Sequence, residues 1–216
     1  MTKTFKAVIW DFGGVFTAPP FDAFARYEAE RGLPRNFIRT VNATNPLDNA
    51  WAKLEQSKVT AAEFDGLFRE EAIALGHDVP GKEILSLLSG SLRPRVVEAL
   101  RVCKGHGKVG CITNNAPVGK GASMTNDEGK AAELAKVFEL FDHLIESSKI
   151  GIRKPDPKIY EMMCEALEVD PADCVYLDDL GINLKPARDM GMTTIKVLGE
   201  DQLLADLKAA TGYALP

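Results

Sequence analysis

Acidic side chains follow two apolar segments of the chain, each at the point where the segment ends. Asp11 comes directly after the segment at 6–10, and Asp178 and Asp179 follow the segment at 174–177. Carboxylates held close together without a cation repel one another by several kcal/mol, so a divalent metal would stabilise such a cluster. Ligand atoms that are all oxygen favour magnesium over zinc. These residues predict a magnesium site, provided that the fold brings them together.

A hydroxyl group and two cations come after two further apolar segments. Thr113 and Asn114 directly follow one of them, and the loop after the other carries Arg153 and Lys154. Each residue alone has an ordinary interpretation, because a polar residue after a strand often caps a turn or a helix and a lone lysine is usually solvated. Their occurrence at successive segment ends, together with the acids, favours one shared functional site.

Five short segments rich in β-branched or apolar residues are the predicted strands that must position these side chains. They lie at 6–10, 108–112, 143–146, 174–177 and 193–197. Helical patterns separate the later ones, and this alternation predicts a parallel sheet with helices on both faces. We therefore expect a Rossmann-like, three-layer α/β fold. Ligands bind outside the carboxyl ends of the strands in such sheets, so the polar residues would gather at one edge.

The stretch from about Pro19 to about Leu92 breaks this alternation. It contains no convincing strand, only helical patterns such as the one at 60–76, which opens with a capping box of Thr60 and Glu63. A helical insert after the first strand would lie as a cap over the edge of the sheet. We expect an α/β core domain made of residues 1–18 and 93–216 and a helical cap domain made of residues 19–92.

Two parts of the chain are candidates for contact with a ligand held between the predicted cap and the sheet. Phe21, Phe24, Trp51 and Leu54 lie in the cap, although their helical spacing also suits its interior. The polar, glycine-containing segment at 116–130 is a predicted mobile surface loop, with a lid as the alternative. A cap that closes over the site would select the substrate and exclude water.

The composition is that of a globular protein and favours neither a nucleic-acid nor a membrane partner. The formal net charge of −5 argues against binding to nucleic acid, which usually requires a basic surface. No segment approaches the roughly 18 consecutive apolar residues of a membrane span, and the N-terminal apolar run lacks the features of a secretory signal. We expect a cytoplasmic protein. Its four cysteines form no C-x-x-C pair, so we expect buried free thiols.

Four motifs occur in a fixed order along the chain. They read Asp11-x-Gly13-Gly14-Val15, Thr113-Asn114, Lys154-Pro155-Asp156-Pro157 and Leu177-Asp178-Asp179. In this order they resemble the motifs of haloacid dehalogenase (HAD) superfamily hydrolases, and the helical insert resembles the small cap of that superfamily. The runs at 144–160 and 176–197 are similar to the N-terminal phosphatase domain of soluble epoxide hydrolases and to the corresponding domain of acyl-CoA dehydrogenase fusion proteins. The resemblance implies a magnesium-dependent phosphohydrolase that acts on a small phosphorylated metabolite.

The resemblance also implies a role for each motif residue. Asp11 would attack phosphorus and form an aspartyl-phosphate. Thr113 and the Asn114 amide would hold phosphoryl oxygens, and Lys154 would balance the charge on Asp11 and on the phosphoryl group. Magnesium would be held by Asp11, the backbone carbonyl of Gly13 and Asp179, with Asp178 in direct contact or just behind.

The chain departs from the family pattern at Gly13. Phosphatases of the superfamily usually carry a second aspartate there, which protonates the leaving oxygen and then activates water. Loss of a general acid/base costs roughly 10²–10⁴-fold in rate. Three explanations stay open: a substrate with a good leaving group such as an acyl phosphate or sugar 1-phosphate, a substitute acid from the cap or the substrate, or a weakened enzyme that serves as a phosphate-ligand or protein-binding module.

Two other activities of the superfamily are alternatives. Dehalogenation of a 2-haloacid also uses an aspartate nucleophile without the second aspartate, but family dehalogenases lack paired carboxylates such as Asp178 and Asp179. Phosphonate hydrolases carry a small residue at the position of Gly13 and use a cap lysine to form a Schiff base. Lys53 lies in the predicted cap, but its ordinary interpretation is a solvated helix lysine.

Overall fold

A five-stranded parallel sheet forms the centre of the molecule. The computed structural model describes residues 4–88, 90–119, 122 and 124–216. Within these residues the strands pair in the order β3-β2-β1-β4-β5. Their bounds are β1 Ala7–Trp10, β2 Lys108–Thr113, β3 His143–Glu146, β4 Cys174–Asp178 and β5 Thr193–Lys196. All five strands predicted from the sequence are therefore confirmed, with ends that differ by one residue at most.

The register of the three central strands brings their carboxyl ends level. Trp10 is the last residue of β1, and it pairs with Cys111 of β2 and with Leu177 of β4. All four residues of β1 are buried, as expected for the central strand of a sheet that is covered on both faces. Because Asp11 follows Trp10, its backbone amide continues the ladder and donates to the carbonyl of Leu177 at 2.8 Å.

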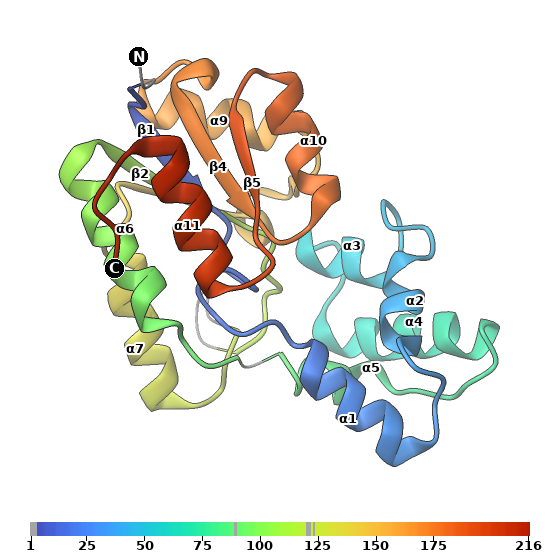
Figure 1. The fold of residues 1–216 in the computed structure, drawn as a ribbon. Helices are drawn as coiled ribbons and strands as arrows, with labels where there is room; N and C mark the ends of the chain where they lie inside the picture. Colours follow the sequence, from blue (N-terminus) through green and yellow to red (C-terminus); the bar gives the residue numbers. More distant parts are fainter. Residues whose placement is uncertain (1–3, 89, 120–121, 123) are drawn as a thin grey trace.

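Helices cover both faces of the sheet. One apolar cluster joins the sheet to α6, α7 and α11, and a second cluster joins the other face to α9 and α10 (Figure 1). This confirms the predicted three-layer α/β fold. The bounds are α6 Pro94–His106, α7 Glu128–Phe138, α8 Ser147–Ile150, α9 Pro157–Leu167, a 3-10 turn at Pro171–Asp173, α10 Gly181–Asp189 and α11 Glu200–Thr211.

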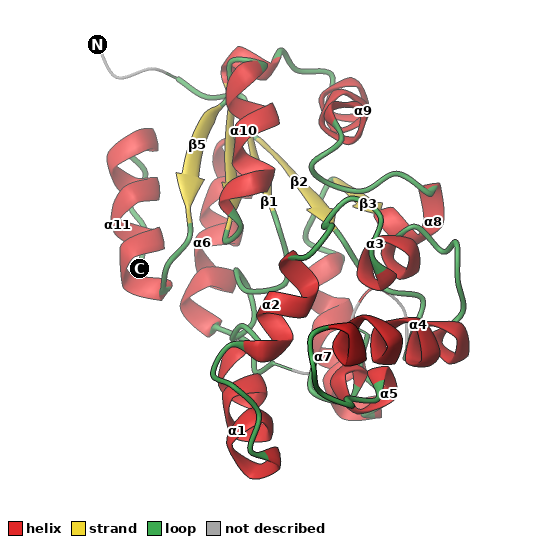
Figure 2. Ribbon diagram, turned by 90° about the vertical axis from the view of Figure 1, so that its right-hand side faces the viewer, coloured by secondary structure: helices red, strands yellow, loops and turns green. Residues whose placement is uncertain are grey.

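The chain between β1 and α6 is helical, as its patterns predicted. It forms α1 Phe21–Arg31, α2 Phe37–Ala43, α3 Ala50–Glu55, α4 Ala61–Ala74 and α5 Gly81–Leu85. These helices bury an apolar cluster of their own and lie beside the carboxyl ends of the strands (Figure 2). The predicted capping box is confirmed, because the Thr60 hydroxyl accepts from the Glu63 amide while the Glu63 carboxylate accepts from the Thr60 amide.

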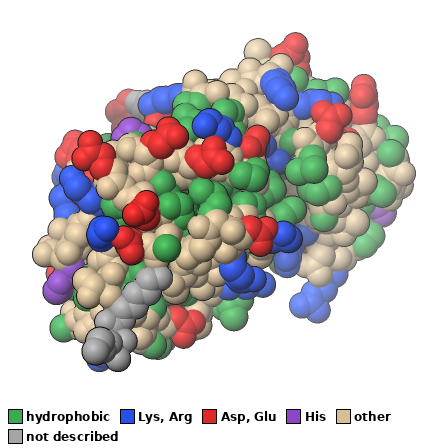
Figure 3. Space-filling model, turned by 90° about the horizontal axis from the view of Figure 1, so that it is seen from above, with side chains coloured by type: hydrophobic (Ala, Val, Ile, Leu, Met, Phe, Trp, Pro, Cys, Tyr) green, Lys and Arg blue, Asp and Glu red, His purple; other side chains and the backbone are tan. Residues whose placement is uncertain are grey.

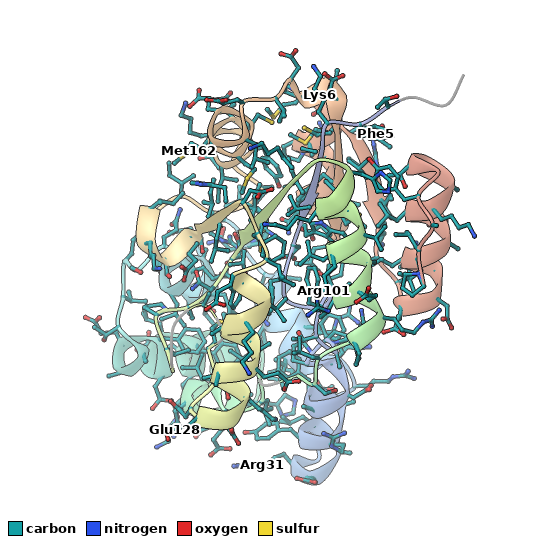
Figure 4. All side chains as sticks on the ribbon, turned by 90° about the vertical axis from the view of Figure 1, so that its left-hand side faces the viewer. Phe5, Lys6, Arg31, Arg101, Glu128 and Met162 are labelled. Carbon is teal, nitrogen blue, oxygen red and sulfur yellow. The ribbon has the colours of Figure 1, made fainter. Side chains whose placement is uncertain are left out.

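Two antiparallel connections join the helical segment to the sheet. Thr17 and Leu92 form an isolated bridge, and the amide of Ala18 donates to the carbonyl of Ser91 at 2.9 Å. A Cβ atom at Gly90 would lie 2.3 Å from the Ala18 carbonyl oxygen, so only glycine permits this close approach. Figure 4 shows the resulting long molecule, with Lys6, the residue before β1, at one end and Arg31 at the other.

The segment at 116–130 differs from the predicted surface loop. Residues 120, 121 and 123 lie outside the described residues. Ala116, Val118 and Met124 pack against the apolar cluster of the helical segment, and α7 already begins at Glu128. Apolar residues of this segment therefore pack against the helical segment, which its glycines and polar residues did not indicate.

The surface carries charged side chains of both signs, in agreement with the composition. Seen from the end that carries the N-terminus, Lys and Arg side chains are interspersed with Asp and Glu around a hydrophobic area (Figure 3). No helix of the described residues is long and apolar enough to cross a bilayer. All four cysteines are buried and free, as predicted.

Candidate active site

The three acidic residues predicted to share a site do lie together. Asp11 follows β1, Asp178 ends β4, and Asp179 follows it. Each offers one carboxylate oxygen within 4.8 Å of the others. Their proximity follows from the pairing of β1 with β4, which ends both strands at the same level. Asp11 and Asp178 are buried, and Asp179 is partly buried.

Lys154 bridges two of these carboxylates. Its ammonium nitrogen lies 2.8 Å from Asp11 Oδ1 and 2.8 Å from Asp178 Oδ2, and its side chain is 1% exposed. Burial alone would lower the pKa of Lys154, but the charges of Asp11 and Asp178 outweigh burial and raise it above the ordinary value. Lys154 is therefore a buried cation, which is stable only because two anions face it.

Asp178 accepts hydrogen bonds at both of its oxygens. The Tyr176 hydroxyl donates to Oδ2 at 2.5 Å, the Leu180 amide donates to Oδ1 at 2.8 Å, and the Asn183 side-chain amide lies 3.1 Å from each oxygen. These donors hold the carboxylate in one orientation, as partners of a ligating or charge-bearing residue commonly do. Sequence patterns did not indicate Tyr176 and Asn183, because hydrogen bonds of this kind follow no pattern along the chain.

Thr113 and Asn114 lie at the end of β2, beside Lys154. Thr113 is buried and lines the same cavity as Asp11. The Asn114 side chain donates to the Lys154 carbonyl at 3.0 Å and accepts from the Lys154 amide at 2.9 Å. This reciprocal pair ties the loop that carries Lys154 to the end of β2, so the side chain of Asn114 positions Lys154.

The two glycines after Asp11 have different surroundings. Gly14 adopts a left-handed φ of +75°, and a Cβ atom there would lie 2.2 Å from Asp179 Oδ2. A Cβ atom at Gly13 would meet nothing within 4 Å. Glycine is therefore required at Gly14 by the close approach of Asp179, whereas Gly13 faces open space.

Replacement of Gly14 by alanine should disturb the acidic cluster more than the fold. The added methyl group must displace the Asp179 carboxylate, and the left-handed backbone costs a further ~1–2 kcal/mol. We expect the concentration of Mg²⁺ that supports half-maximal activity to rise at least about tenfold, which corresponds to about 1.4 kcal/mol. Gly66→Ala is the matched control, because a Cβ atom there meets nothing within 4 Å. If Gly14→Ala and Gly66→Ala needed the same concentration of Mg²⁺, the expectation that Asp179 binds the metal would be contradicted.

A cavity of about 510 Å³ opens above the acidic residues, between the sheet and the helical segment. The sheet side contributes Asp11, Thr113, Asn114, Lys154 and Asp179. The helical segment contributes Phe21, Phe24 and Trp51. Leu54, the fourth candidate of the predicted cap, is fully buried in the cluster of the helices and does not line the cavity.

Glu55 and Arg153 form an ion pair at the wall of this cavity. Arg153 Nε lies 2.7 Å from Glu55 Oε2, and Arg153 also donates to the Pro46 carbonyl at 2.9 Å. The side chain of Arg153 is only 17% exposed and that of Glu55 only 16%. Burial raises the pKa of Glu55 above its ordinary value, although the nearby charges of Arg153 and Lys154 oppose the rise. Arg153 directly precedes Lys154 in the sequence, but no sequence pattern indicated that Glu55 is the partner of Arg153.

The acidic cluster has the donor set of a magnesium site. Burial and the neighbouring charges of Asp178 and Asp179 raise the pKa of Asp11 well above its ordinary value, even though Lys154 opposes the rise. Burial and Asp178 raise the pKa of Asp179 to about 6. These shifts show that one lysine does not compensate the three carboxylates. A hard divalent cation with oxygen ligands, such as Mg²⁺, fits this excess of negative charge.

Comparisons with known proteins identify a matching protein family and several relatives of this chain. Residues 5–191 match the family model of haloacid dehalogenase-like hydrolases. The bifunctional epoxide hydrolase 2 of Mus musculus is 31% identical over 222 residues, which cover 98% of this chain but only 40% of that protein. The sesquiterpene phosphatase astK of Aspergillus oryzae is 27% identical, and the match covers 98% of this chain and 100% of that one.

A solved structure shares the fold. It is a HAD family enzyme of Bacteroides thetaiotaomicron in complex with magnesium and inorganic phosphate. The two proteins are 20% identical and superpose with a TM-score of 0.60 over 91% of this chain and 96% of the other. This likeness supports the arrangement of strands and helices described above.

Proposed function

The chain belongs to the haloacid dehalogenase-like hydrolases, and within this family we propose that it is a magnesium-dependent phosphatase of a small phosphorylated metabolite. One observation carries the proposal. The carboxylate of Asp11 lies at the floor of a cavity, beside Asp179 and 2.8 Å from the buried cation Lys154. A nucleophile, a metal-binding carboxylate and a fixed positive charge are what phosphoryl transfer through an aspartyl-phosphate requires.

Each residue has a definable task in this reaction. An oxygen of Asp11 attacks phosphorus, and the bond from phosphorus to the leaving oxygen breaks. Thr113 and the Asn114 amide hold phosphoryl oxygens, and Lys154 offsets the charge that Asp11 and the phosphoryl group share. Bound Mg²⁺, which Asp11, the Gly13 carbonyl and Asp179 would hold, supplies further charge neutralisation. Asp178, with both oxygens already hydrogen-bonded, orients Lys154 from behind.

The helical segment supplies the wall that selects the substrate. We take residues 19–92 as a cap domain, because these helices pack around their own apolar cluster and line the cavity opposite Asp11. Phe21, Phe24 and Trp51 make this wall largely apolar. The part of the substrate beyond the phosphate is therefore an apolar group, a preference also supported by the likeness to a sesquiterpene phosphatase.

The same geometry disfavours two of the alternatives. A halide-displacing enzyme needs no cluster of three carboxylates, and Asp11, Asp178 and Asp179 form one here. Lys53 lies 3.7 Å from Asp48 and is absent from the cavity wall, so it does not suit a Schiff-base role. A binding module on a weakened active site is the remaining alternative, and turnover separates it from a phosphatase.

Removal of the metal should abolish turnover. We expect release of inorganic phosphate from p-nitrophenyl phosphate with Mg²⁺, and loss of that release when a chelator binds the metal. Acetyl phosphate, whose leaving group needs little protonation, serves as a second substrate. Activity that survives the chelator would contradict the metal requirement, and metal binding without turnover on either substrate would favour the binding module.

A further inference from the structure

Gly13 leaves the proposed phosphatase without an acid at the position that usually supplies one. An alkoxide is a poor leaving group, so a phosphatase of alkyl esters needs a proton donor near the leaving oxygen. The following inference rests on the function proposed above and asks which side chain of this protein supplies that proton. The donor must line the cavity and must be free of the metal.

One carboxyl group satisfies both conditions. Among the described residues, the carboxylates that line the cavity are Asp11, Asp179 and Glu55. Asp11 is the nucleophile, and Asp179 belongs to the acidic cluster. Glu55 is the remaining acid, and it comes from the opposite wall of the cavity, at the end of α3.

The position of Glu55 is fixed by contacts with the sheet domain. The Nε atom of Arg153 donates to its carboxylate at 2.7 Å. The Ser57 hydroxyl, two residues further on, donates to the Ser148 carbonyl at 2.5 Å. These contacts tie the end of α3 to the loop that carries Lys154, whose ammonium group lies 2.8 Å from Asp11.

The reaction geometry places the leaving group on the same side as Glu55. In a phosphoryl transfer, the attacking and leaving oxygens lie roughly in line on opposite sides of phosphorus. Asp11 attacks from the sheet side of the cavity, so the leaving oxygen departs toward the helical side of the lining, to which Glu55 belongs. A carboxyl group on that side can protonate the leaving oxygen directly or through one bridging water.

We propose that Glu55 is the general acid that protonates the leaving oxygen, in place of the aspartate that Gly13 lacks, and that Arg153 is its positioning residue. In the first step an Asp11 oxygen bonds to phosphorus, the electron pair of the broken bond goes to the leaving oxygen, and the Glu55 proton goes to the same oxygen. In the second step Glu55 takes a proton from water, the water oxygen bonds to phosphorus, and the bond from phosphorus to Asp11 breaks, which restores the carboxylate.

The charges around Glu55 suit both steps. Burial raises its pKa, which favours the protonated form that the first step needs. Arg153 and Lys154 are the cations that face it, and both stabilise the carboxylate that remains after proton transfer. The arriving phosphate adds negative charge and opposes ionisation of Glu55 before the transfer.

The variant Glu55→Gln tests the proposal through its dependence on the leaving group. The ratio kcat/KM reports the steps up to departure of that group, before hydrolysis of the intermediate. On an alkyl phosphate we expect kcat/KM to fall by about 10²-fold, whereas on p-nitrophenyl phosphate it should fall by less than about fivefold. An equal loss on both substrates, or no loss on either, would overturn the proposal. Failure of the wild-type protein to release phosphate would instead refute the proposed phosphatase.

Two further variants separate proton transfer from a structural role. Arg153→Gln removes the residue that positions Glu55 but keeps the carboxyl group, so its loss of kcat/KM should also fall mainly on the alkyl phosphate and should be smaller than that of Glu55→Gln. An equal loss on both substrates would contradict the positioning role of Arg153. Gly13→Asp places an acid in the open space above Asp11. The double variant of Gly13→Asp and Glu55→Gln should have a kcat/KM on the alkyl phosphate at least about tenfold higher than that of Glu55→Gln alone. A double variant as slow as Glu55→Gln on this substrate would show that the missing function is not proton donation.

Discussion

Replacement of Asp11 by asparagine should reduce phosphate release by on the order of 10⁴-fold or more, because loss of a nucleophile removes the covalent route entirely. The amide of asparagine has nearly the volume of the carboxylate, so the buried position stays filled. It cannot attack phosphorus, however, and it offers Lys154 a neutral partner in place of the anion that lies 2.8 Å away. The measurement is release of inorganic phosphate from p-nitrophenyl phosphate at saturating Mg²⁺.

A second observable distinguishes the nucleophile from a residue that only binds metal. Acid quench of the wild-type protein during turnover should trap one phosphoryl group on the peptide that contains Asp11, and the variant should trap none. Asp201→Asn is a suitable control, because Asp201 is 88% exposed and pairs with Arg95 at the surface. A phosphorylated peptide in the Asp11 variant would show that another residue is the nucleophile.

The sheet and the position of the site could be predicted because short-range patterns determine them. A run such as AVIW, with no polar residue, suits a strand that is covered on both faces, and the first polar residue after it must leave the sheet. The carboxyl ends of parallel strands share one edge, so Asp11, Thr113 and Asp178 were expected at that edge. Their close approach depends in addition on the pairing of β1 with β2 and with β4, which order along the chain does not determine.

The contacts between the helical segment and the sheet could not be predicted in the same way. Glu55 ends the short helix α3 and Arg153 lies in a loop 98 residues away, and no periodicity along the chain indicates that they pair. The same applies to Phe21 and Leu54, which have similar helical patterns, yet only Phe21 lines the cavity. Which face of a short helix meets a ligand depends on how the helices pack, and that depends on the whole apolar cluster rather than on any one segment.

Replacement of Lys154 by methionine should destabilise the metal-free protein by about 3–5 kcal/mol, because it leaves two buried carboxylates without their cation. Methionine keeps an unbranched side chain in a position that is 1% exposed, so the loss comes from charge rather than from shape. For a chain of this length the melting temperature should fall by about 6–20 °C. Activity should also fall, by about 10³-fold, since the fixed charge beside Asp11 is lost.

Magnesium and acid should each restore part of this stability. A bound cation lowers the repulsion between Asp11 and its neighbours, so Mg²⁺ should raise the melting temperature of the variant more than that of the wild type. Burial already raises the pKa of Asp11 in the folded state, and loss of Lys154 raises it further. A group whose folded-state pKa is raised gains stability as the pH falls, so the deficit of the variant should narrow from about pH 8 to about pH 5.

The exposed pair of Lys185 and Asp189 supplies the matched control. Their side chains are 76% and 60% exposed, and a surface pair of this kind contributes about 0–1 kcal/mol. Lys185→Met should therefore melt within a few degrees of the wild type at every pH and metal concentration. If Lys154→Met behaved in the same way, the buried carboxylates of Asp11 and Asp178 would have to be protonated or compensated without Lys154, and the charge arrangement on which the proposed reaction depends would be wrong.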